Sequence, residues 1–386
     1  MTDFTTPPED ILGKLIDDCL AAGASAADAR LSVSEGVSVA VREGKLESIE
    51  RDESAGVALR CLFGKRHAHV SGTDLSPDAL ALLASRCAAM AEAAPEDEYA
   101  GLADADELAK DMPEIDLSGD PDMSPETLEA DAIEAEAAAL AVKGVKMVAS
   151  CGNGWSRSER WVAASNGFVS HKAGGSSGLG LAAVAEGKDG AMERDYDSWS
   201  TRRIVDRPSP AEIGKTAGER TIARLDPRKV ETQTASVIYD KRVSSSLLGA
   251  LIGAISGSAV ARGTSFLKEK LGEQVFADGI NIIDDPFRTR GMGSRSHDGE
   301  GRPVRMTHLI EDGRLTDWLM NGPAARQLGL KANGFSSMGF GDPPGIATSN
   351  LHLAAGNITP DAMMKSAGKG LLVTDMFGPS INANTG

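Results

Sequence analysis

The chain has 386 residues, more than one hydrophobic core usually supports, so its length predicts two domains. Hydrophobic residues make up 41% and charged residues 25%, which is typical of a folded globular protein and excludes disorder throughout. The net charge of −16 arises almost entirely in residues 95–136, where sixteen acidic residues accompany one base, and we interpret this segment as a solvated loop and helix face. No stripe of Lys and Arg remains elsewhere to neutralise phosphates, so direct nucleic-acid binding is not expected.

Three further features predict a reduced, cytoplasmic protein that does not cross a membrane. The start of the chain lacks the basic and apolar regions of a secretory signal. The most apolar stretch, residues 247–260, is too short to span a bilayer. The cysteines are scattered, without CxxC spacing or a neighbouring histidine, as expected for free thiols (Cys19, Cys61, Cys87, Cys151).

The first elements in chain order are a helix, a meander of strands and a second helix. Residues 8–23 carry apolar side chains at helical spacing and close on Gly23. From Arg30 to Gly72, apolar and polar residues alternate around a turn at 43–44, which predicts an antiparallel meander with one solvent-exposed face. Ser76 and Pro77 then begin a helix that reaches about Ala94.

The next elements complete the first predicted domain. Ser124 caps a helix to about Val142, and Ser209 caps another that ends near Leu225. Between these helices, the sequence predicts strands at 145–151, 167–173, 177–186 and 191–199, with a turn at 166–167. The boundary is predicted at Asp226, before Pro227, which ends the helix, so the domains would be 1–226 and 227–386.

The second half of the sequence has a different pattern of predicted elements. A strand at 234–239 is followed by one long helix rich in small residues, from Lys241 to about Ala261, and then by short strands between Gly-rich loops. The whole pattern predicts an α+β protein. Its N-terminal domain would hold an antiparallel sheet with flanking helices, and its C-terminal domain a mixed or antiparallel β structure around one central small-residue helix.

A search for catalytic and metal-binding patterns finds none. The histidines do not form HExxH, and His67 and His69 share a strand face without an evident third ligand. Residues 174–178 fit GxSxG, but they lie between two predicted strands, where a plain turn is expected. The acidic pairs of the second half are expected to be solvated (Asp284 with Asp285, Asp298 with Glu300).

Five stretches in order nevertheless resemble the TldD/PmbA family, known as modulators of DNA gyrase and as peptidase subunits. They are the meander GVSVAVREGKLESIERDESAGVALRCLFGKR, the segments WVAASNG and DYDS, the segment AVARGTSFLKEKLGEQV, and the loop DGEGRP. The resemblance implies that TldD-type chains carry HExxxH on a central helix, and a later Cys, as a zinc site. PmbA-type chains, also called TldE, lack it. Here the corresponding helix reads LLGALIGAISGS, which offers no plausible zinc ligand, so no catalytic or metal-binding residue is carried over.

The resemblance therefore implies a non-catalytic PmbA/TldE-like subunit, without a cofactor of its own, of a cytosolic zinc peptidase. A TldD-like partner would supply the zinc, and the heterodimer would cleave small or unfolded peptides and peptide precursors. The alternative is a homodimeric binding protein for peptides or for a regulatory partner such as gyrase, without proteolysis. A weaker third possibility is an independent hydrolase that uses the acidic loop at 298–300.

Residues expected to contact a peptide channel or a partner follow the central helix or lie in the Gly-rich loops (Arg262, Gly263, Ser265, Asp298, Glu300, Gly301, Asn350). Plain roles in turns or caps are equally compatible with each of them. The family also usually continues with further strands past an NxxTG-like segment, which corresponds here to residues 382–386.

Overall fold

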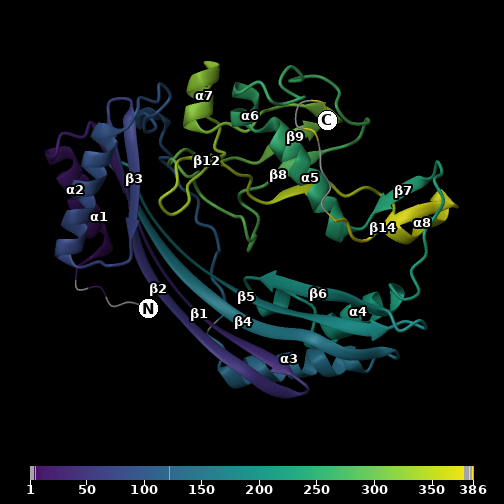
Figure 1. Cartoon of the computed structure of the whole chain (residues 1–386). Coiled ribbons are helices and arrows are strands. Elements are labelled where there is room, and N and C mark those ends of the chain that lie inside the picture. Colours follow the sequence, from purple (N-terminus) through teal and green to yellow (C-terminus); the bar gives the residue numbers. More distant parts are fainter. Residues whose placement is uncertain (1–3, 5, 121, 378–381, 383–384, 386) are drawn as a thin grey trace.

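The N-terminal half is built on one six-stranded antiparallel sheet in the order β3-β2-β1-β4-β5-β6. Its strands are β1 (Ala26–Arg42), β2 (Lys45–Phe63), β3 (Arg66–Gly72), β4 (Val145–Ala164), β5 (Val169–Glu186) and β6 (Met192–Thr201). The computed structural model describes residues 4, 6–120, 122–377, 382 and 385, so most of the NxxTG-like segment and of the extreme N-terminus lies outside it. The sheet is strongly curled, with helices on its outer face and the C-terminal half across its inner face (Figure 1).

Two pairs of helices cover the outer face of the sheet. They are α1 (Pro8–Ala21) with α2 (Pro77–Ala93), and α3 (Pro125–Leu140) with α4 (Pro210–Ala223). The odd-numbered residues of β1 are buried under them, because successive side chains of a strand point to opposite faces. The predicted caps are confirmed at α3 and α4, where Ser124 and Ser209 accept hydrogen bonds from backbone N–H groups of the first turn.

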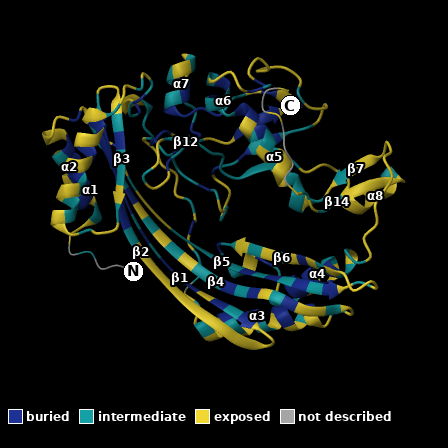
Figure 2. Ribbon diagram, in the orientation of Figure 1, coloured by how far each residue is buried: buried dark blue, intermediate teal, exposed yellow. Residues whose placement is uncertain are grey.

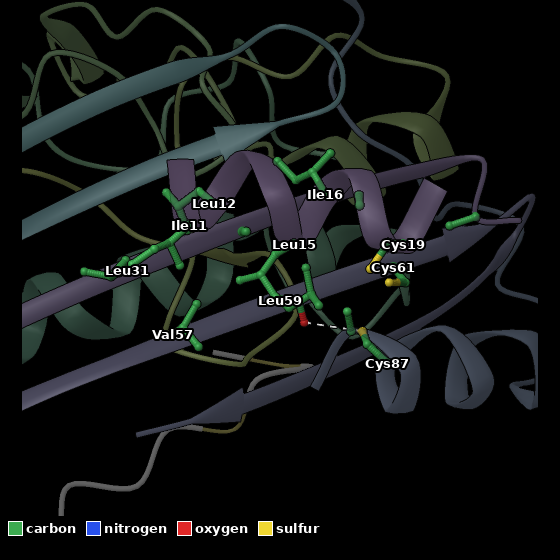
Figure 3. Close-up of a cluster of buried hydrophobic side chains, with 14 of the residues drawn as sticks. Ile11, Leu12, Leu15, Ile16, Cys19, Leu31, Val57, Leu59, Cys61 and Cys87 are labelled. Atoms are coloured by element: carbon green, nitrogen blue, oxygen red, sulfur yellow. Dashed lines mark hydrogen bonds between the residues drawn. The ribbon is translucent and has the colours of Figure 1, made fainter. Parts of the chain in front are cut away.

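The core under α1 and α2 also contains three of the four free cysteines. Figure 3 shows Leu15 of α1 pointing toward Leu59 of β2, with Cys19, Cys61 and Cys87 at one end of this cluster. The thiol of Cys87 donates to the backbone oxygen of Leu59 at 3.6 Å. These cysteines therefore pack as small apolar side chains inside the core.

The hairpin between β1 and β2 depends on a buried acid from α3. Glu43 and Gly44 both have positive φ, at 53° and 69°, and the first half of β2 beyond them is exposed (Figure 2). Their N–H groups donate to the two carboxylate oxygens of Glu136, at 2.9 and 2.6 Å. Glu136 is buried, so the prediction that the acidic segment is solvated is wrong at this residue.

β4 and β5 are longer than the sequence predicts. Residues 174–178 do not form a turn, because β5 runs without interruption and pairs Gly174 with Ser158 and Gly178 with Gly154 of β4. The predicted turn is therefore wrong. Glycine pairs frequently mark turns, but this pair lies in a strand that another backbone segment approaches closely: a Cβ on Gly175 would lie 3.0 Å from the backbone of Gly119.

The C-terminal half combines small sheets and short helices. The antiparallel sheet β10-β9-β8-β13 is joined by the antiparallel pair β11-β12 and the parallel pair β14-β7. The elements are β7 (Ser236–Tyr239), α5 (Lys241–Ile255), α6 (Gly257–Ala261), β8 (Ile282–Asp284), β9 (Thr307–Glu311), β10 (Arg314–Leu315), α7 (Gly322–Leu328), β11 (Ser336–Ser337), β12 (Gly345–Ile346), β13 (Leu351–Leu353), α8 (Pro360–Ala367) and β14 (Gly370–Val373). Two 3₁₀ turns, Ala105–Glu107 and Ile204–Asp206, lie outside it.

The central small-residue helix is present, but it is broken at Ser256. This residue is extended, with φ −63° and ψ 124°, and separates α5 from α6. At the break, Leu319 donates its N–H to the oxygen of Ile255 at 2.9 Å and accepts from the N–H of Gly257 at 2.8 Å. Pairing with a distant segment thus replaces helical hydrogen bonds, and the prediction of a single helix from 241 to 261 is wrong.

The two halves are held together by arginines that cross between them. Arg202 follows β6 and is buried, and Arg242 of α5 binds Asp195 of β6 at 2.8 Å. The guanidinium of Arg202 donates to four backbone oxygens, from the segment between α2 and α3, from β5 and from a C-terminal loop (Leu117, Gly175, Gly291, Met292). No helix among the described residues is long and apolar enough to span a bilayer.

Candidate functional site

The middle of the inner face of the curled sheet is lined by glycine, serine and alanine. Even-numbered residues of the strands point to this face, since the odd-numbered ones pack under the outer helices. Their cross-strand partners form four rows running from β1 toward β6, and we call these residues the Gly/Ser floor (Ala40, Gly152, Gly180, Ser198; Ser38, Gly154, Gly178, Ser200; Gly36, Ser156, Ser176; Ser34, Ser158, Gly174).

The curl of the sheet explains why these residues are small. A Cβ atom on Gly36 would lie 2.9 Å from the backbone oxygen of Trp155, and one on Gly154 would lie 2.8 Å from that of Val37. On Gly180 it would lie 2.7 Å from the Cβ of Ser198. At these three positions a side chain would force neighbouring strands apart, so the curl needs glycine there.

Connected open spaces follow the Gly/Ser floor. One cavity of about 580 Å³ is lined by floor residues of β1, β4, β5 and β6 together with Glu50 and Asp52 of β2. A second, of about 240 Å³, shares Ser156 and Ser176 with it and continues toward the C-terminal half. A third, of about 1090 Å³, also shares these two serines and is lined by residues 114–120, 122 and 123 of the acidic segment between α2 and α3. The floor is therefore the base of an accessible groove.

The serines of the floor provide hydrogen-bonding groups along this groove. Ser156 and Ser176 lie 3.2 Å apart through their hydroxyls. Among the described residues, the hydroxyls of Ser38, Ser158 and Ser200 have no hydrogen-bond partner. Each hydroxyl can both donate and accept, which suits main-chain amides of any sequence.

Basic side chains border the groove where it meets the C-terminal half. Arg160 and Lys172 face each other across β4 and β5, and the ammonium group of Lys172 donates to the backbone oxygen of Ser294 at 3.1 Å. Partial burial of this ammonium, and the charges of Arg202, Arg160 and Arg295, lower the pKa of Lys172 to about 8. This end of the groove therefore carries a positive potential.

The residues predicted after the central helix lie in two different environments. Arg262 and Gly263 are exposed at the end of α6. Ser265 is buried; its hydroxyl donates to the oxygen of Ala254 at 2.5 Å and accepts from the N–H of Leu267 at 2.9 Å. A channel or partner contact at these positions stays a prediction, and none of them lies on the Gly/Ser floor.

The predicted acidic loop is internal, so the expectation that Asp298 and Glu300 are solvated is wrong. Asp298 is 1% exposed and accepts backbone N–H groups from Glu300 and Arg302, both at 2.9 Å. Its burial, and the charge of Glu300, raise its pKa to about 6. Glu300 accepts from the N–H of Gly322 at 2.7 Å and pairs with Arg302 at 3.1 Å. Asp284, also expected to be solvated, is buried and accepts from Ser349.

Gly301 and Asn350 hold loops in place. Gly301 has φ 85°, and a Cβ there would lie 2.7 Å from the ring of Phe168. The amide of Asn350 accepts from the N–H of Gly293 at 3.0 Å and donates to the hydroxyl of Ser294 at 2.9 Å. Ser294 also supplies the oxygen bound by Lys172, so Asn350 acts on the groove only through this loop.

The residues present do not fit a zinc site. Across the described part of the chain, no three His, Cys, Asp or Glu side chains are grouped so that they could hold a metal ion. On the central helix, the hydroxyls of Ser256 and Ser258 bond to each other at 3.0 Å. His67 and His69 lie 3.2 Å apart through Nδ1 and Nε2, and burial, helped by Arg60, lowers the pKa of His69 to about 4.

Sequence reasoning missed the Gly/Ser floor, although the signal is present in the sequence. Small residues recur at every second position, as in Ser34, Gly36 and Ser38 of β1 and in the run from Gly174 to Gly180 of β5. Such alternation marks the face of a strand that a neighbouring backbone or a ligand approaches closely.

Models of three domains of the PmbA/TldA metallopeptidases match the chain: domain 1 at residues 27–91, the central domain at 119–225 and the C-terminal domain at 232–386. The metalloprotease PmbA of Escherichia coli O157:H7 is 33% identical over 371 residues, which cover 95% of this chain and 80% of that protein. A PmbA homologue of Haemophilus influenzae is 29% identical over 366 residues, or 95% of this chain and 79% of the homologue.

Solved structures of two other proteins have the same fold. A proposed modulator of DNA gyrase from Bacteroides thetaiotaomicron superposes with a TM-score of 0.89 at 23% identity, covering 98% of this chain and 84% of that one. TldE from Thermococcus kodakarensis gives 0.82 at 20% identity, covering 96% and 83%. At these identities the likeness concerns the fold.

Proposed function

Since this chain belongs to the PmbA/TldD family of metallopeptidases, we propose that it is a non-catalytic, TldE-like subunit of a two-chain zinc peptidase. In this proposal it holds extended peptides, and a TldD-like partner supplies the zinc and cleaves them. The assembly would act in the cytoplasm on small or unfolded peptides and on peptide precursors.

The Gly/Ser floor is the single observation that carries the proposal. A groove above side chains as small as Gly154 and Ser156 admits a main chain closely and makes little demand on its side chains. Unpaired hydroxyls along it offer hydrogen bonds to amides, which every peptide contains. A site of this kind suits substrates that share an extended conformation and no particular sequence.

The chemistry of the described residues supports a division of labour between two chains. The family resemblance places zinc ligands on the central helix of TldD-type chains, whereas α5 and α6 carry small and apolar residues there. Hydrolysis would then depend on a partner. The proteins similar to this chain include one named as a TldD homologue and one named TldE.

The test is to purify this chain and a TldD-like relative from the same cell, separately and together, and to measure cleavage of an unfolded peptide. We expect cleavage only in the mixture. Ser176→Trp, which fills the groove, should reduce it at least tenfold, whereas the control Ser85→Trp on the exposed face of α2 should not.

Two results would contradict the proposal. One tightly bound zinc per chain, or peptide cleavage by this chain alone, would show that it is itself the catalytic subunit. Peptide binding without any effect on the partner's activity would instead favour the homodimeric binding protein.

A further inference from the structure

The basic end of the groove contains two cations, Arg160 and Lys172, that form no ion pair with a carboxylate among the described residues. The 240 Å³ cavity is lined by Arg160, Lys172 and Arg202 together with serines, glycines and Met292. Arg160 forms no hydrogen bond or ion pair with any described residue. Within the described part of the chain, Lys172 donates only to the backbone oxygen of Ser294. Arg202 donates there only to backbone oxygens, and the charge of Asp116 partly balances its own.

Such an arrangement is unexpected in a chain of net charge −16. The positive potential lowers the pKa of two separate side chains, Lys172 and His297. The pKa of Lys172 is lowered by burial and by three arginines. The pKa of His297 is lowered by burial and, among the charges, by Lys172 and Arg295. An anion placed between Arg160 and Lys172 would relieve this repulsion, so the cavity is electrostatically suited to one.

The other end of the groove has the opposite sign. Glu50 and Asp52 lie on β2 in the same cross-strand rows as Ser38 and Gly36, and both are exposed without an ion pair among the described residues. From Asp52 to Lys172 the sheet spans three strand spacings of about 4.8 Å and about four residues along the strands, or at most about 20 Å. An extended peptide of roughly six residues covers this length.

We propose that the groove binds extended peptides in one direction, with the terminal carboxylate between Arg160 and Lys172 and the amino end toward Glu50 and Asp52. The inference rests on the proposed peptide-holding function and adds polarity to it. Nucleic acid fits less well, because its phosphates would meet Glu50 and Asp52 and would find a largely uncharged floor between the two ends.

Binding of a six-residue peptide of alanine and serine with one internal lysine to the full chain tests this polarity. An internal lysine of the peptide carries fluorescein on its side chain, so both ends remain variable, and fluorescence anisotropy gives the Kd. Amidation of the C-terminus should weaken binding about tenfold, as expected for loss of a charge-assisted hydrogen bond in a partly enclosed site. Acetylation of the amino end should weaken it about threefold, as for a surface charge pair.

Single-residue variants show which side chains bind the terminal carboxylate of the peptide. Lys172→Gln and, independently, Arg160→Gln should weaken binding of the free acid to the level of the amide and leave the amide unchanged. Lys143→Gln removes the same charge from an exposed site outside the groove and should change neither Kd. Equal binding of acid and amide by the unmodified chain would overturn the carboxylate site while leaving the peptide-holding function intact.

Other outcomes separate the remaining possibilities. Failure of the acid and the amide alike to bind would overturn the peptide-holding function and this inference together. Displacement of the peptide by inorganic phosphate at an equal concentration would show a site for small anions, and tighter binding of a single-stranded hexanucleotide would show a nucleic-acid site. Either result contradicts the proposal.

Discussion

Replacing Arg202 with methionine should loosen the attachment of the C-terminal half to the sheet. Arg202 is 7% exposed, and its guanidinium donates to four backbone oxygens at 2.8 to 3.3 Å. Methionine keeps most of the apolar stem but leaves all four oxygens without this donor. The perturbation is therefore chiefly a loss of hydrogen bonds and not of packing.

The expected size follows from these contacts. A hydrogen bond from a charged donor contributes about 1.5–3 kcal/mol, so four would give about 6 kcal/mol at the lower limit. Burial of the guanidinium, which also lowers the pKa of Arg202, costs part of this, and water can reach some of the freed oxygens. We expect Arg202→Met to lower the free energy of unfolding by about 3 kcal/mol.

Urea unfolding followed by tryptophan fluorescence measures this loss, and hydrogen exchange at residues 288–294 shows whether the loop is released. Arg203→Met is the matched control, since Arg203 bonds the exposed hydroxyl of Ser118 at 2.6 Å and lies 3.8 Å from Asp116. It should cost less than about 1 kcal/mol. Equal urea midpoints for the two variants would refute the role assigned to Arg202.

Three further outcomes are expected. Glu136→Gln should lower the free energy of unfolding by about 1–2 kcal/mol, because it weakens the two bonds to the turn at 43–44; thermal melting against the exposed control Glu134→Gln measures this. The raised pKa of Asp298 means that the folded chain binds its proton more tightly, so stability falls as pH rises from about 4 to about 6. Asp298→Asn should remove about 3 kcal/mol of this dependence, seen in urea midpoints across that range. Because the pKa of Lys172 is lowered to about 8, binding of the free-acid peptide with an acetylated amino end should weaken between pH 7 and pH 9, while anisotropy shows no change for the acetylated amide; acetylation is needed because a free amino end titrates in the same range.

Interactions between neighbouring residues predict where helices begin. They do not predict a helix break that depends on a segment distant in the sequence. Ser124 and Ser209 cap helices that begin where expected, because a cap is formed by neighbouring residues. Ser256 breaks the central helix because Leu319, sixty-three positions later, pairs with the backbone at that point. Nothing in residues 241–261 contains that information.

The acidic residues show the same limit. Asp298 and Glu300 look like solvated loop acids, because adjacent charges between glycines are usually exposed. In the structure, their burial depends on backbone N–H groups supplied by Arg302 and Gly322 and on the charge of Arg302. A sequence shows which charges exist, whereas their solvation depends on the donors that the fold brings to them.

Residues of the Gly/Ser floor both shape the curled sheet and line the groove proposed to bind peptides. Only some of them can be substituted to test binding without also changing the fold. At Gly154 and Gly180, any side chain meets a neighbouring strand before it reaches the groove, so a substitution there would alter the curl. At Ser38 and Ser200, a Cβ is already accommodated and the hydroxyl has no partner among the described residues. Changes at these serines would alter what the groove offers a peptide while the strands keep their places. Gly154 and Gly180 therefore report on how the groove is formed, and Ser38 and Ser200 on what it binds.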